Sequence, residues 1–516
     1  MTTFGIDLGT TYSCISYVGD DGELVIVRNG EGQELTPSVV YFESPHNVVV
    51  GEQAKDAAKS DAERVVALIK RQMGNRDTEF DFDGVSYTPE SVSAFILRDL
   101  VRSAQKATGS EVADAVITVP AYFGLSERHA TRLAGEIAGL NVVSVVPEPV
   151  AAALHYGALP GSGDRTILVY DLGGGTFDTT VIRLHDGDVT VVCTDGDHHL
   201  GGADWDDRVV TYLSECFVAA HPDAGADESE TFQQGLGLIA EDLKKSLSTR
   251  ASKRQLVQHG GAKLNVDLSR EMFEELTADL LNRTLEITAR TLRVAEELGA
   301  GRPDTLLLVG GSTSMPAVAR ALRASLGLEP RVHDPHLAVA KGAAMFALQE
   351  AIRIRGPEDE TADVPEKPAT KVTIVVPRAF GVGVVARDTE PEDGKTEVRH
   401  LLEANTPLPS SKITEQFFTA VSNQTSIHIT IWEQAGAEAS HLVEFNKQIG
   451  EGVIERLPVL PKGSPIDISF AMNETGVLTV EASELTTGQK ILIEVQIGGL
   501  DDRRVKQARE AVARLS

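Results

Sequence analysis

The stretch Val169-Tyr170-Asp171-Leu172-Gly173-Gly174-Gly175-Thr176-Phe177-Asp178 decides how this chain is interpreted. Apolar residues precede Asp171, as in a buried strand, and the glycines after it let the backbone turn sharply and approach a ligand closely. Exposed backbone N–H groups in such a turn form a cradle for an anion, and the Thr176 hydroxyl adds a donor. The stretch therefore predicts a phosphate-binding turn.

The same pattern occurs once more, near the start of the chain, as Ile6-Asp7-Leu8-Gly9-Thr10-Thr11. Both copies follow an apolar strand and precede another strand pattern, so we expect a duplicated α/β body with one turn in each half. Neither copy is a Walker loop or a dinucleotide fingerprint, because no Gly-Lys-Ser/Thr and no helix follows. For either turn taken alone, a glycine hairpin with a capping aspartate is the alternative.

The aspartates of these turns would repel a phosphate unless a cation or water lay between them. We therefore interpret Asp7 and Asp171 as outer ligands of a nucleotide-bound Mg²⁺, which keeps several of its waters. Asp178 follows closely enough to join them.

A third glycine segment, Leu308–Pro316, ends a buried strand and precedes a helix. Alone it is a helix cap, but as the third turn of a duplicated fold it suits a nucleoside.

Strand and helix patterns alternate as far as about residue 355, which is typical of an α/β fold. The strand candidates include Ala115–Val119, Ile167–Tyr170 and Leu306–Val309, and the helix candidates include Ser91–Ala107, Arg128–Ala138 and Glu271–Leu298.

The segment after Gly356 is acidic and rich in proline, which indicates a solvated linker. Short alternating runs then predict a β-sandwich: Val372–Val376, Ser426–Ile431, Ile466–Phe470 and Ile491–Ile497. We predict an α/β domain over 1–355, a linker with an apolar connector over 356–376, a sandwich over 377–500 and a short helix over 501–516.

Composition excludes several classes of function. The 516 residues include 76 acidic and 48 basic side chains, a net charge of -28, which disfavours binding to nucleic acid or an anionic membrane. No apolar run reaches the length of a membrane-spanning helix. Cys14, Cys193 and Cys216 have neither zinc-site nor disulfide spacing, and with no signal peptide we expect a reducing cytoplasm.

Together these segments resemble the DnaK-type, seventy-kilodalton heat-shock chaperones over nearly the whole chain. The two glycine turns match best, and Val119–Phe123, Glu148–Ala153 and Asp197–Gly202 also resemble the family. The resemblance implies an actin-like ATPase domain that binds ATP or ADP with Mg²⁺, and a sandwich that binds peptides.

The resemblance also implies roles for individual residues. Lys70 would orient the attacking water, Asp171 would accept its proton, and Thr176 would contact the γ-phosphate. Glu148 would join these catalytic residues, and together with Pro120 and Arg128 it would also sense that phosphate. The remaining nucleotide-binding residues would be Gly9, Thr10, Thr11, Tyr12, Gly173, Gly174, Gly175, Gly201, Gly202, Glu241, Lys244, Lys245, Ser248, Gly310, Gly311 and Ser312. Without the family, Lys70 would be a solvated lysine, Glu148 a helix-start carboxylate and the Glu241 helix face a row of surface ion pairs.

In the sandwich, five residues align with the family's peptide cleft: Val382, Phe417, Ala420, Ile427 and Ile429. Alternating apolar residues of this kind belong to a core more often than to a cleft.

The sequence departs from the family at identifiable points. Ser314 replaces a basic residue that stacks on adenine, and His336 replaces an acidic residue. Four positions that help to receive J-domain co-chaperones carry other residues, which makes such a partner doubtful: Ser144, Pro147, Val150 and Ile374. Only the segment Asp501–Ser516 follows the sandwich in this sequence, so we expect the family's helical lid to be missing.

We expect an ATP-dependent chaperone, active in protein folding and the stress response, that binds and releases extended apolar peptides. A nucleotide exchange factor is a possible partner. The first alternative is a nucleotide-sensing interaction protein with little folding activity, and the second is a small-molecule kinase of actin-like fold.

Overall fold

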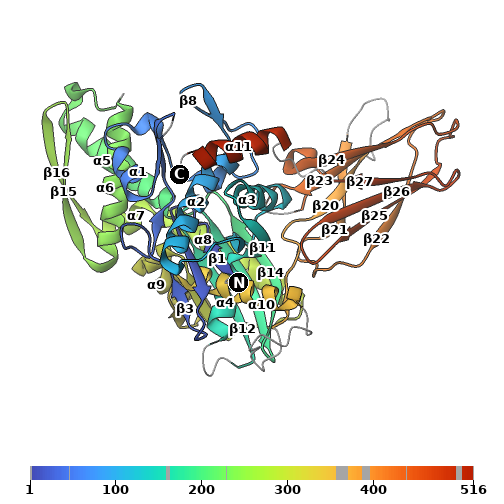
Figure 1. The fold of residues 1–516 in the computed structure, drawn as a ribbon, viewed down its shortest axis with the longest axis horizontal. Coiled ribbons are helices and arrows are strands. Elements are labelled where there is room, and N and C mark those ends of the chain that lie inside the picture. Colours follow the sequence, from blue (N-terminus) through green and yellow to red (C-terminus); the bar gives the residue numbers. More distant parts are fainter. Residues whose placement is uncertain are drawn as a thin grey trace.

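The computed structural model describes residues 3–45, 47–158, 163–227, 229–355, 370–385, 396–436, 439–495 and 502–514 (Figure 1). Its N-terminal part is built on two mixed sheets with the same order of strand directions. In each sheet, two successive parallel pairings lie on one side of a central strand, and two successive antiparallel pairings lie on the other. This repetition agrees with the duplicated α/β body expected from the two glycine turns.

The first sheet has the order β11-β10-β1-β2-β3, and β4 pairs with β2. Its strands are β1 (Phe4–Asp7), β2 (Tyr12–Val18), β3 (Leu24–Ile26), β4 (Thr36–Pro37), β10 (Asp114–Val119) and β11 (Asn141–Pro147). Two smaller sheets extend this half: β5 (Val40–Ser44), β6 (Asn47–Val50) and β7 (Val65–Val66), and β8 (Phe80–Phe82) with β9 (Val85–Tyr87).

The second sheet has the order β18-β17-β12-β13-β14-β19. Its strands are β12 (Arg165–Leu172), β13 (Phe177–His185), β14 (Asp188–Asp197), β17 (Thr305–Val309), β18 (Pro330–Val332) and β19 (Val372–Thr373). A hairpin of β15 (Ser252–His259) and β16 (Ala262–Ser269) projects from this half, at the left of Figure 1.

Helices surround both sheets and fill the space between them. They are α1 (Glu52–Ala57), α2 (Pro89–Thr108), α3 (Leu125–Ile137), α4 (Glu148–Gly157), α5 (Gly202–Ala220), α6 (Glu230–Thr249), α7 (Arg270–Leu276), α8 (Ala278–Glu297), α9 (Pro316–Leu326) and α10 (Ala338–Arg355). Between the two halves, α4 and α10 cross so closely that a Cβ on Gly342 would lie 1.8 Å from the carbonyl oxygen of Ala151. Only glycine fits there, so the crossing fixes how the halves meet.

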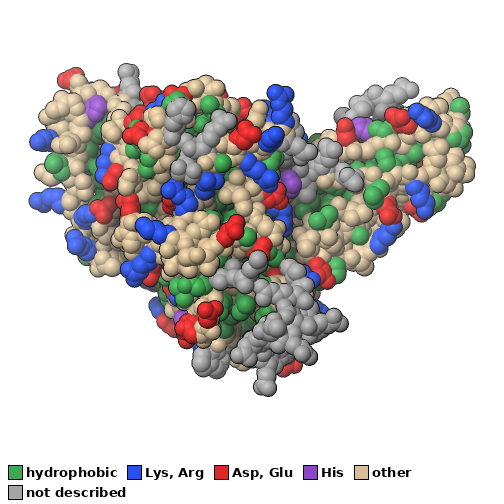
Figure 2. Space-filling model, in the orientation of Figure 1, with side chains coloured by type: hydrophobic (Ala, Val, Ile, Leu, Met, Phe, Trp, Pro, Cys, Tyr) green, Lys and Arg blue, Asp and Glu red, His purple; other side chains and the backbone are tan. Residues whose placement is uncertain are grey.

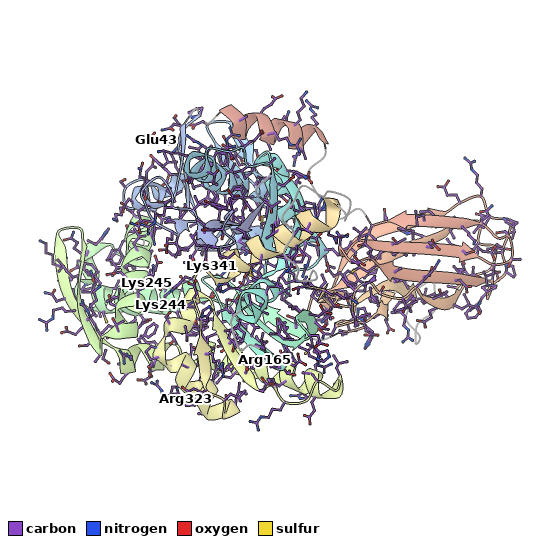
Figure 3. All side chains as sticks on the ribbon, turned by 60° about the horizontal axis from the view of Figure 1, so that its bottom comes forward. Glu43, Arg165, Lys244, Lys245, Arg323 and Lys341 are labelled. Atoms are coloured by element: carbon purple, nitrogen blue, oxygen red, sulfur yellow. The ribbon has the colours of Figure 1, made fainter. Side chains whose placement is uncertain are left out.

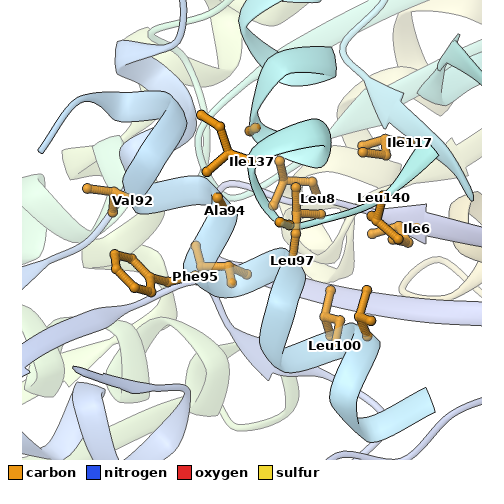
Figure 4. Packing of buried hydrophobic residues seen from close by; sticks show 14 of the residues in the cluster. Ile6, Leu8, Val92, Ala94, Phe95, Leu97, Leu100, Ile117, Ile137 and Leu140 are labelled. Carbon is orange, nitrogen blue, oxygen red and sulfur yellow. The ribbon is translucent and has the colours of Figure 1, made fainter. Parts of the chain in front are cut away.

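The core of the first half lies between its sheet and helices α2 and α3 (Figure 4). Helix α2 begins at Pro89 behind the Thr88 cap and ends before Gly109, which adopts the left-handed conformation. The labelled side chains that pack together are Ile6, Leu8, Val92, Ala94, Phe95, Leu97, Leu100, Ile117, Ile137 and Leu140. Burial of each large apolar side chain contributes about 1.5–3 kcal/mol, so this core holds the Asp7 turn in a fixed position.

The predicted single helix over Glu271–Leu298 is wrong in detail, because the structure divides it into α7 and α8. The break lies at Thr277, whose backbone leaves the α region (φ −117°, ψ 11°). Its hydroxyl donates to the carbonyl of Phe273 at 2.8 Å and thereby satisfies the end of α7. Uninterrupted apolar spacing in the sequence gave no sign of this break.

The C-terminal part is a sandwich of two antiparallel sheets, at the right of Figure 1. One sheet has the order β21-β20-β23-β24 and the other β22-β25-β26-β27. The strands are β20 (Phe380–Val385), β21 (Thr396–Leu402), β22 (Ile413–Phe418), β23 (Ile427–Gln434), β24 (Asn446–Ile454), β25 (Pro465–Met472), β26 (Leu478–Glu484) and β27 (Lys490–Glu494). One apolar cluster fills the space between the sheets.

The segment Val372–Val376 was expected among the sandwich strands, and this prediction is wrong for its first half. Val372 and Thr373 form β19, which pairs in parallel with β14 at the edge of the second α/β sheet. Val375 then bridges Pro407 of the sandwich. The connector therefore belongs to both parts of the chain, because it pairs with β14 of the α/β body and with Pro407 of the sandwich. The sequence pattern could not reveal the first pairing, because it depends on an unpaired sheet edge far away in the sequence.

The last helix, α11 (Asp502–Arg514), packs against α2 and α3 rather than against the sandwich. Val512 is fully buried in the core of the first half, and Val505 and Ala508 pack beside it. Arg504 pairs with Glu79 at 3.1 Å and thus adds an ion pair at the rim. Helix α11 is in this way tied to the N-terminal half.

Acidic and basic side chains are interspersed over the face of the molecule in Figure 2. Among the described helices, none combines the length and the apolarity needed to cross a bilayer.

Candidate active site

A cavity of about 1540 Å³ lies between the two α/β halves. All three glycine turns reach it, and α1 and α6 close its outer end. Lys244 and Lys245 lie side by side on α6 (Figure 3). The structure thus brings to one cavity the segments that the sequence analysis assigned to a nucleotide.

The first two turns contact each other directly. A Cβ on Gly174 would lie 2.1 Å from Oγ1 of Thr11, and a Cβ on Gly175 would lie 2.2 Å from Cγ2 of Thr10. Side chains at these glycines are excluded because the threonines of the opposite turn occupy the space. The result is a lining of backbone N–H groups and hydroxyls, which suits phosphate oxygens.

The predicted turn at Gly201 and Gly202 packs onto the second glycine turn. The N–H of Gly202 donates to the carbonyl of Gly173 at 3.0 Å, and Ser312 donates its hydroxyl to the same carbonyl at 2.8 Å. Nζ of Lys244 donates to the carbonyl of Gly202 at 2.6 Å. Segments far apart in the sequence therefore brace the phosphate side of the cavity.

Four carboxylates gather at the base of the cavity, where strands β1, β12 and β13 and helix α4 meet. Asp171, Asp178 and Glu148 are buried. Asp7, Asp171 and Glu148 line the cavity, and Asp178 lies opposite Asp171 in the β12–β13 pair. Nζ of Lys70 forms an ion pair with Glu148 at 2.5 Å. The backbone N–H of Tyr122 donates to Oδ1 of Asp178 at 3.0 Å.

These carboxylates are hard to ionise together. Burial, and next the charge of Glu148, raises the pKa of Asp7 and of Asp178 to about 7. Burial and the same neighbour raise the pKa of Asp171 well above its ordinary value. Moreover, Oδ2 of Asp171 and Oδ2 of Asp178 are buried without a hydrogen-bond partner among the described groups.

A hard divalent cation fits this arrangement. Buried carboxylate oxygens without partners, in a cluster where negative charge exceeds the charge of Lys70, are the donor set that Mg²⁺ prefers, with water completing its shell. Asp7, Asp171 and Asp178 would hold it.

The outer end of the cavity is closed by a polar cluster across the two halves. The hydroxyl of Tyr12 donates to Glu241 at 3.1 Å, and Lys245 pairs with Glu241 at 2.7 Å and donates to Tyr12 at 2.9 Å. Lys55 of α1 also forms an ion pair with Glu241. Burial acts to raise the pKa of Glu241, but Lys245 and Lys55 outweigh it and hold that pKa at about 2.

Lys244 is directed differently from its neighbour, because it pairs with Asp206 at 2.6 Å inside the second half. Ser248, Ser314 and His336 also line the cavity, as do Gly310 and Gly311. Gly310 adopts a positive φ of 84°, and a Cβ there would lie 2.4 Å from the carbonyl oxygen of Leu172. The third turn can therefore take this path only with glycine.

The fold and the site agree with a comparison against protein families, in which the Hsp70 protein family model matches residues 3–83 and 75–513. The chain belongs to the Hsp70 family. This match confirms the resemblance drawn from the sequence. Members of the family are in general chaperones that hydrolyse ATP, bind ATP or ADP with Mg²⁺ and bind peptides.

In this Hsp70 protein, one group of predicted residues is arranged differently from the expectation. Pro120, Arg128 and Glu148 were expected to act together on the γ-phosphate. Glu148 does face Lys70, but Arg128 donates to the carbonyls of Ala121 and Phe123, at 3.1 Å and 2.9 Å. In this structure Arg128 holds the segment after Pro120 in place and has no described contact with Glu148.

The predicted cleft residues divide into two groups. Val382, Ile427 and Ile429 are each less than 10% exposed and lie inside the apolar cluster of the sandwich. Phe417 is half-buried and packs against that cluster, and Ala420 is also half-buried. Three of the five therefore serve as core in this arrangement, and their role in peptide binding stays a prediction.

Two cations at the site were missed by the sequence analysis. Lys55 closes the outer end of the cavity, and Nε of Arg71 donates to the carbonyl of Gly175 at 2.9 Å while its guanidinium pairs with Asp204. Neither lies in a glycine turn, and both partners are distant in sequence. Arg71 directly follows Lys70, and this adjacency was the one feature of the sequence that could have placed Arg71 at the site.

Proposed function

We propose that this Hsp70 protein is an ATP-driven peptide-binding chaperone, in which hydrolysis between the two α/β halves controls the sandwich. The observation that carries the proposal is the meeting of both glycine turns over one buried carboxylate cluster with Lys70 beside it. Cleavage of the terminal phosphate depends on positioning and on charge stabilisation, and this cavity offers both.

The residues have separable tasks in this scheme. Backbone N–H groups of the two turns, with Thr10, Thr11 and Thr176, would hold the phosphates. Lys70 would orient the attacking water, and Oδ2 of Asp171, which has no described hydrogen-bond partner, would accept the proton of that water. A bound Mg²⁺ would supply charge neutralisation for the phosphates.

Contacts between the cavity and the sandwich support coupling. Tyr122 donates its backbone N–H to Asp178 and its hydroxyl to the carbonyl of Gly436 in the sandwich, at 3.0 Å and 3.1 Å. The N–H of Thr194 donates to Oδ1 of Asn405 at 2.9 Å. A change at the carboxylate cluster could therefore alter how the sandwich sits, and peptide and nucleotide would then affect each other reciprocally.

The decisive experiment measures the affinity of a fluorescent, extended apolar peptide for the full chain with ATP, with ADP and without nucleotide. We expect binding at least about tenfold weaker with ATP, which corresponds to a coupling free energy of about 1.4 kcal/mol. Equal affinity in the three states would contradict the coupling.

The variant for the peptide site is Phe417→Ala, with Phe418→Ala as its matched control. Phe417 packs towards the sandwich core, and Phe418 is 60% exposed on the opposite face of the same strand. Peptide binding should weaken in Phe417→Ala and stay unchanged in Phe418→Ala. Ile427→Asp is a poorer choice, because a charge at this buried position would destabilise the sandwich itself.

A second candidate is a nucleotide-sensing interaction protein with little folding activity. It is favoured by the burial of Val382, Ile427 and Ile429 in the sandwich core. It predicts no peptide binding in any nucleotide state, while small-angle X-ray scattering still detects a nucleotide-dependent change in shape.

Partners and location form the remaining part of the proposal. Extended peptides are the expected clients, and a nucleotide exchange factor is compatible with the open cavity. The changed residues Ser144, Pro147, Val150 and Ile374 argue against a standard J-domain partner. Cys14, Cys193 and Cys216 are all free thiols, which supports a reducing compartment such as the cytoplasm.

A further inference from the structure

A second cavity, of about 310 Å³, lies among helices α5 to α9 of the second half, at the left of Figure 1. Its apolar walls include five side chains that are each less than 5% exposed: Trp205, Leu247, Phe273, Met315 and Val318. Cavities of this volume with apolar and aromatic walls are typical of small-molecule sites.

Two features of the chain keep this cavity open. The break between α7 and α8 at Thr277 interrupts what would otherwise be a continuous helix surface. On α9, Ala317, Ala321 and Ala324 face the cavity with spacings of four and three residues. Larger side chains at these positions would fill the space.

One polar group inside the cavity lacks a partner. Glu274 pairs with Arg320 through Oε2 at 2.5 Å, but its Oε1 is buried without a hydrogen-bond partner among the described residues. A buried acceptor left in this state is costly, and a ligand that donates to it recovers that free energy.

The charges around Glu274 determine which donor fits. Arg270 and Arg320 both line the cavity, and the guanidinium of Arg270 donates to the carbonyls of Leu247 and Arg250. A cationic ligand would be repelled by these two groups, and an anionic ligand would be repelled by the free oxygen of Glu274. A neutral N–H or O–H donor meets neither penalty.

We propose that this cavity is a second ligand site, for a compact neutral aromatic molecule with one N–H or O–H donor directed at Oε1 of Glu274. The aromatic body would lie against Trp205, Phe273 and Met315, where ring and sulfur contacts add to apolar burial.

A ligand bound at this site would also change the affinity of the large cavity between the halves for its nucleotide. Ser248 and Met315 line both cavities, and Met315 directly follows the turn that ends at Ser314. A ligand held against Leu247 and Met315 therefore restrains the end of α6 and the start of α9. This second step rests on the proposed nucleotide binding, and the effect must be reciprocal.

The test uses the full chain and indole as the probe. Calorimetric titration should give saturable binding of indole, and benzofuran, in which an acceptor oxygen replaces the N–H, should bind at least about tenfold more weakly. Glu274→Gln should weaken indole binding severalfold, and Glu275→Gln, its exposed neighbour outside the cavity, should leave it unchanged. Ala321→Phe should fill the cavity and abolish binding, with Ala324→Leu as a second filling variant.

Equal affinities for indole and benzofuran would overturn the site, as would unchanged indole binding in both filling variants. For the second step, the affinity of a fluorescent ADP analogue is measured with and without saturating indole, and we expect at least about a threefold change. An unchanged value would overturn the coupling. Failure of the analogue to bind without indole would instead contradict the proposed nucleotide function.

Discussion

Glu433, on strand β23 of the sandwich, accepts a hydrogen bond from the backbone N–H of Leu125, the first residue of helix α3, at 3.1 Å. A carboxylate of one domain thus caps a helix of the other, where the helix dipole favours negative charge. Gly124 makes the contact possible, because a Cβ there would lie 2.3 Å from Oε1 of Glu433.

Arg378 completes this contact between the domains. Its guanidinium lies 5.0 Å from the centre of the Tyr122 ring and 3.5 Å from Glu127. Arg378 and Glu433 are both almost fully buried, so neither charge is solvated on its own. Docking of the sandwich depends on keeping this buried set complete.

Glu433→Ala should therefore undock the sandwich. Removal of one member of a buried charged set costs about 3–5 kcal/mol, because the partner charge is left uncompensated. Hydrogen exchange at the Leu125 amide should become faster, and Glu451→Ala on the exposed face of β24 should leave it unchanged. Retained protection of Leu125 in Glu433→Ala would show that other contacts hold the domains together.

Docking should also depend on pH. Burial raises the pKa of Glu433 from 4.5 to about 7, and its Oε2 has no described partner. At Glu433 the docked state therefore binds a proton more readily than the undocked state, so the contribution of Glu433 to docking should strengthen as pH falls from about 7 towards 4.5 and be constant above about 7. Below this window Glu127 acts in the opposite sense: burial acts to raise its pKa, but Arg378 outweighs it and holds that pKa below its usual value.

The check is a pH series of small-angle X-ray scattering on the wild type and Glu433→Gln, with Lys447 and His198 unchanged beside the contact. Glutamine is neutral at every pH, so the variant should lose the strengthening of docking between 7 and 4.5. The opposite contribution of His198, whose pKa is lowered to about 4 by burial and next by Arg378, should remain, so docking of the variant should weaken as pH falls through this window. A variant with the same pH profile as the wild type would assign the dependence to another group.

The glycine turns could be predicted from the sequence because everything that defines them is local. An apolar strand, an aspartate and successive glycines lie within ten residues, and the structure brings both copies to one cavity. The break at Thr277 and the pairing of Val372 with Val189 could not be predicted in this way. The first depends on one buried hydroxyl, and the second on a sheet edge formed nearly two hundred residues earlier.

Lys55 is a residue of the site that local sequence patterns likewise could not predict. It lies on a short helix without a motif, and it reaches Glu241 only because the two halves close over the cavity. Lys70, in contrast, was assigned through the family resemblance, and its burial next to Glu148 could not be expected from a lysine beside an arginine. Sequence patterns alone therefore do not predict the ion pairs of this site whose two residues lie far apart in the sequence.

Lys70→Ala should slow ATP hydrolysis at least about tenfold while nucleotide binding is largely retained, because Lys70 would act mainly on the transition state. Single-turnover hydrolysis measures the rate, and calorimetry measures the affinity for ATP. Lys59→Ala, at an exposed ion pair with Asp56, is the control. If hydrolysis in Lys70→Ala equals that of the wild type, the role assigned to Lys70 is wrong.

Val512→Asp should detach helix α11 from the first half. The helix has 13 residues, which is marginal for an isolated helix in water, so its order depends on packing. Val512 is fully buried there, and an unpaired carboxylate at this position would be strongly unfavourable. Hydrogen exchange over 502–514 should approach the rate of an unstructured peptide, and the exposed Gln507→Asp should retain protection. Protection in both variants would show that the ion pairs alone hold α11.

Ser314→Arg should tighten ATP binding. Ser314 is exposed at the wall of the large cavity, close to His336, whose ring lies against Gly311. Burial lowers the pKa of His336, so this imidazole is neutral at pH 7 and supplies no cation to a base. A guanidinium at position 314 could stack on the base, and a contact of this kind is worth about 0.5–2 kcal/mol, which corresponds to about a twofold to thirtyfold gain in affinity. Calorimetry decides this, with Ser325→Arg on the same half as a control that adds equal charge away from the cavity. A gain in Ser325→Arg as well would assign the effect to net charge, and an unchanged or weaker affinity in Ser314→Arg would mean that the base is held by the Tyr12 and Lys245 side of the cavity instead.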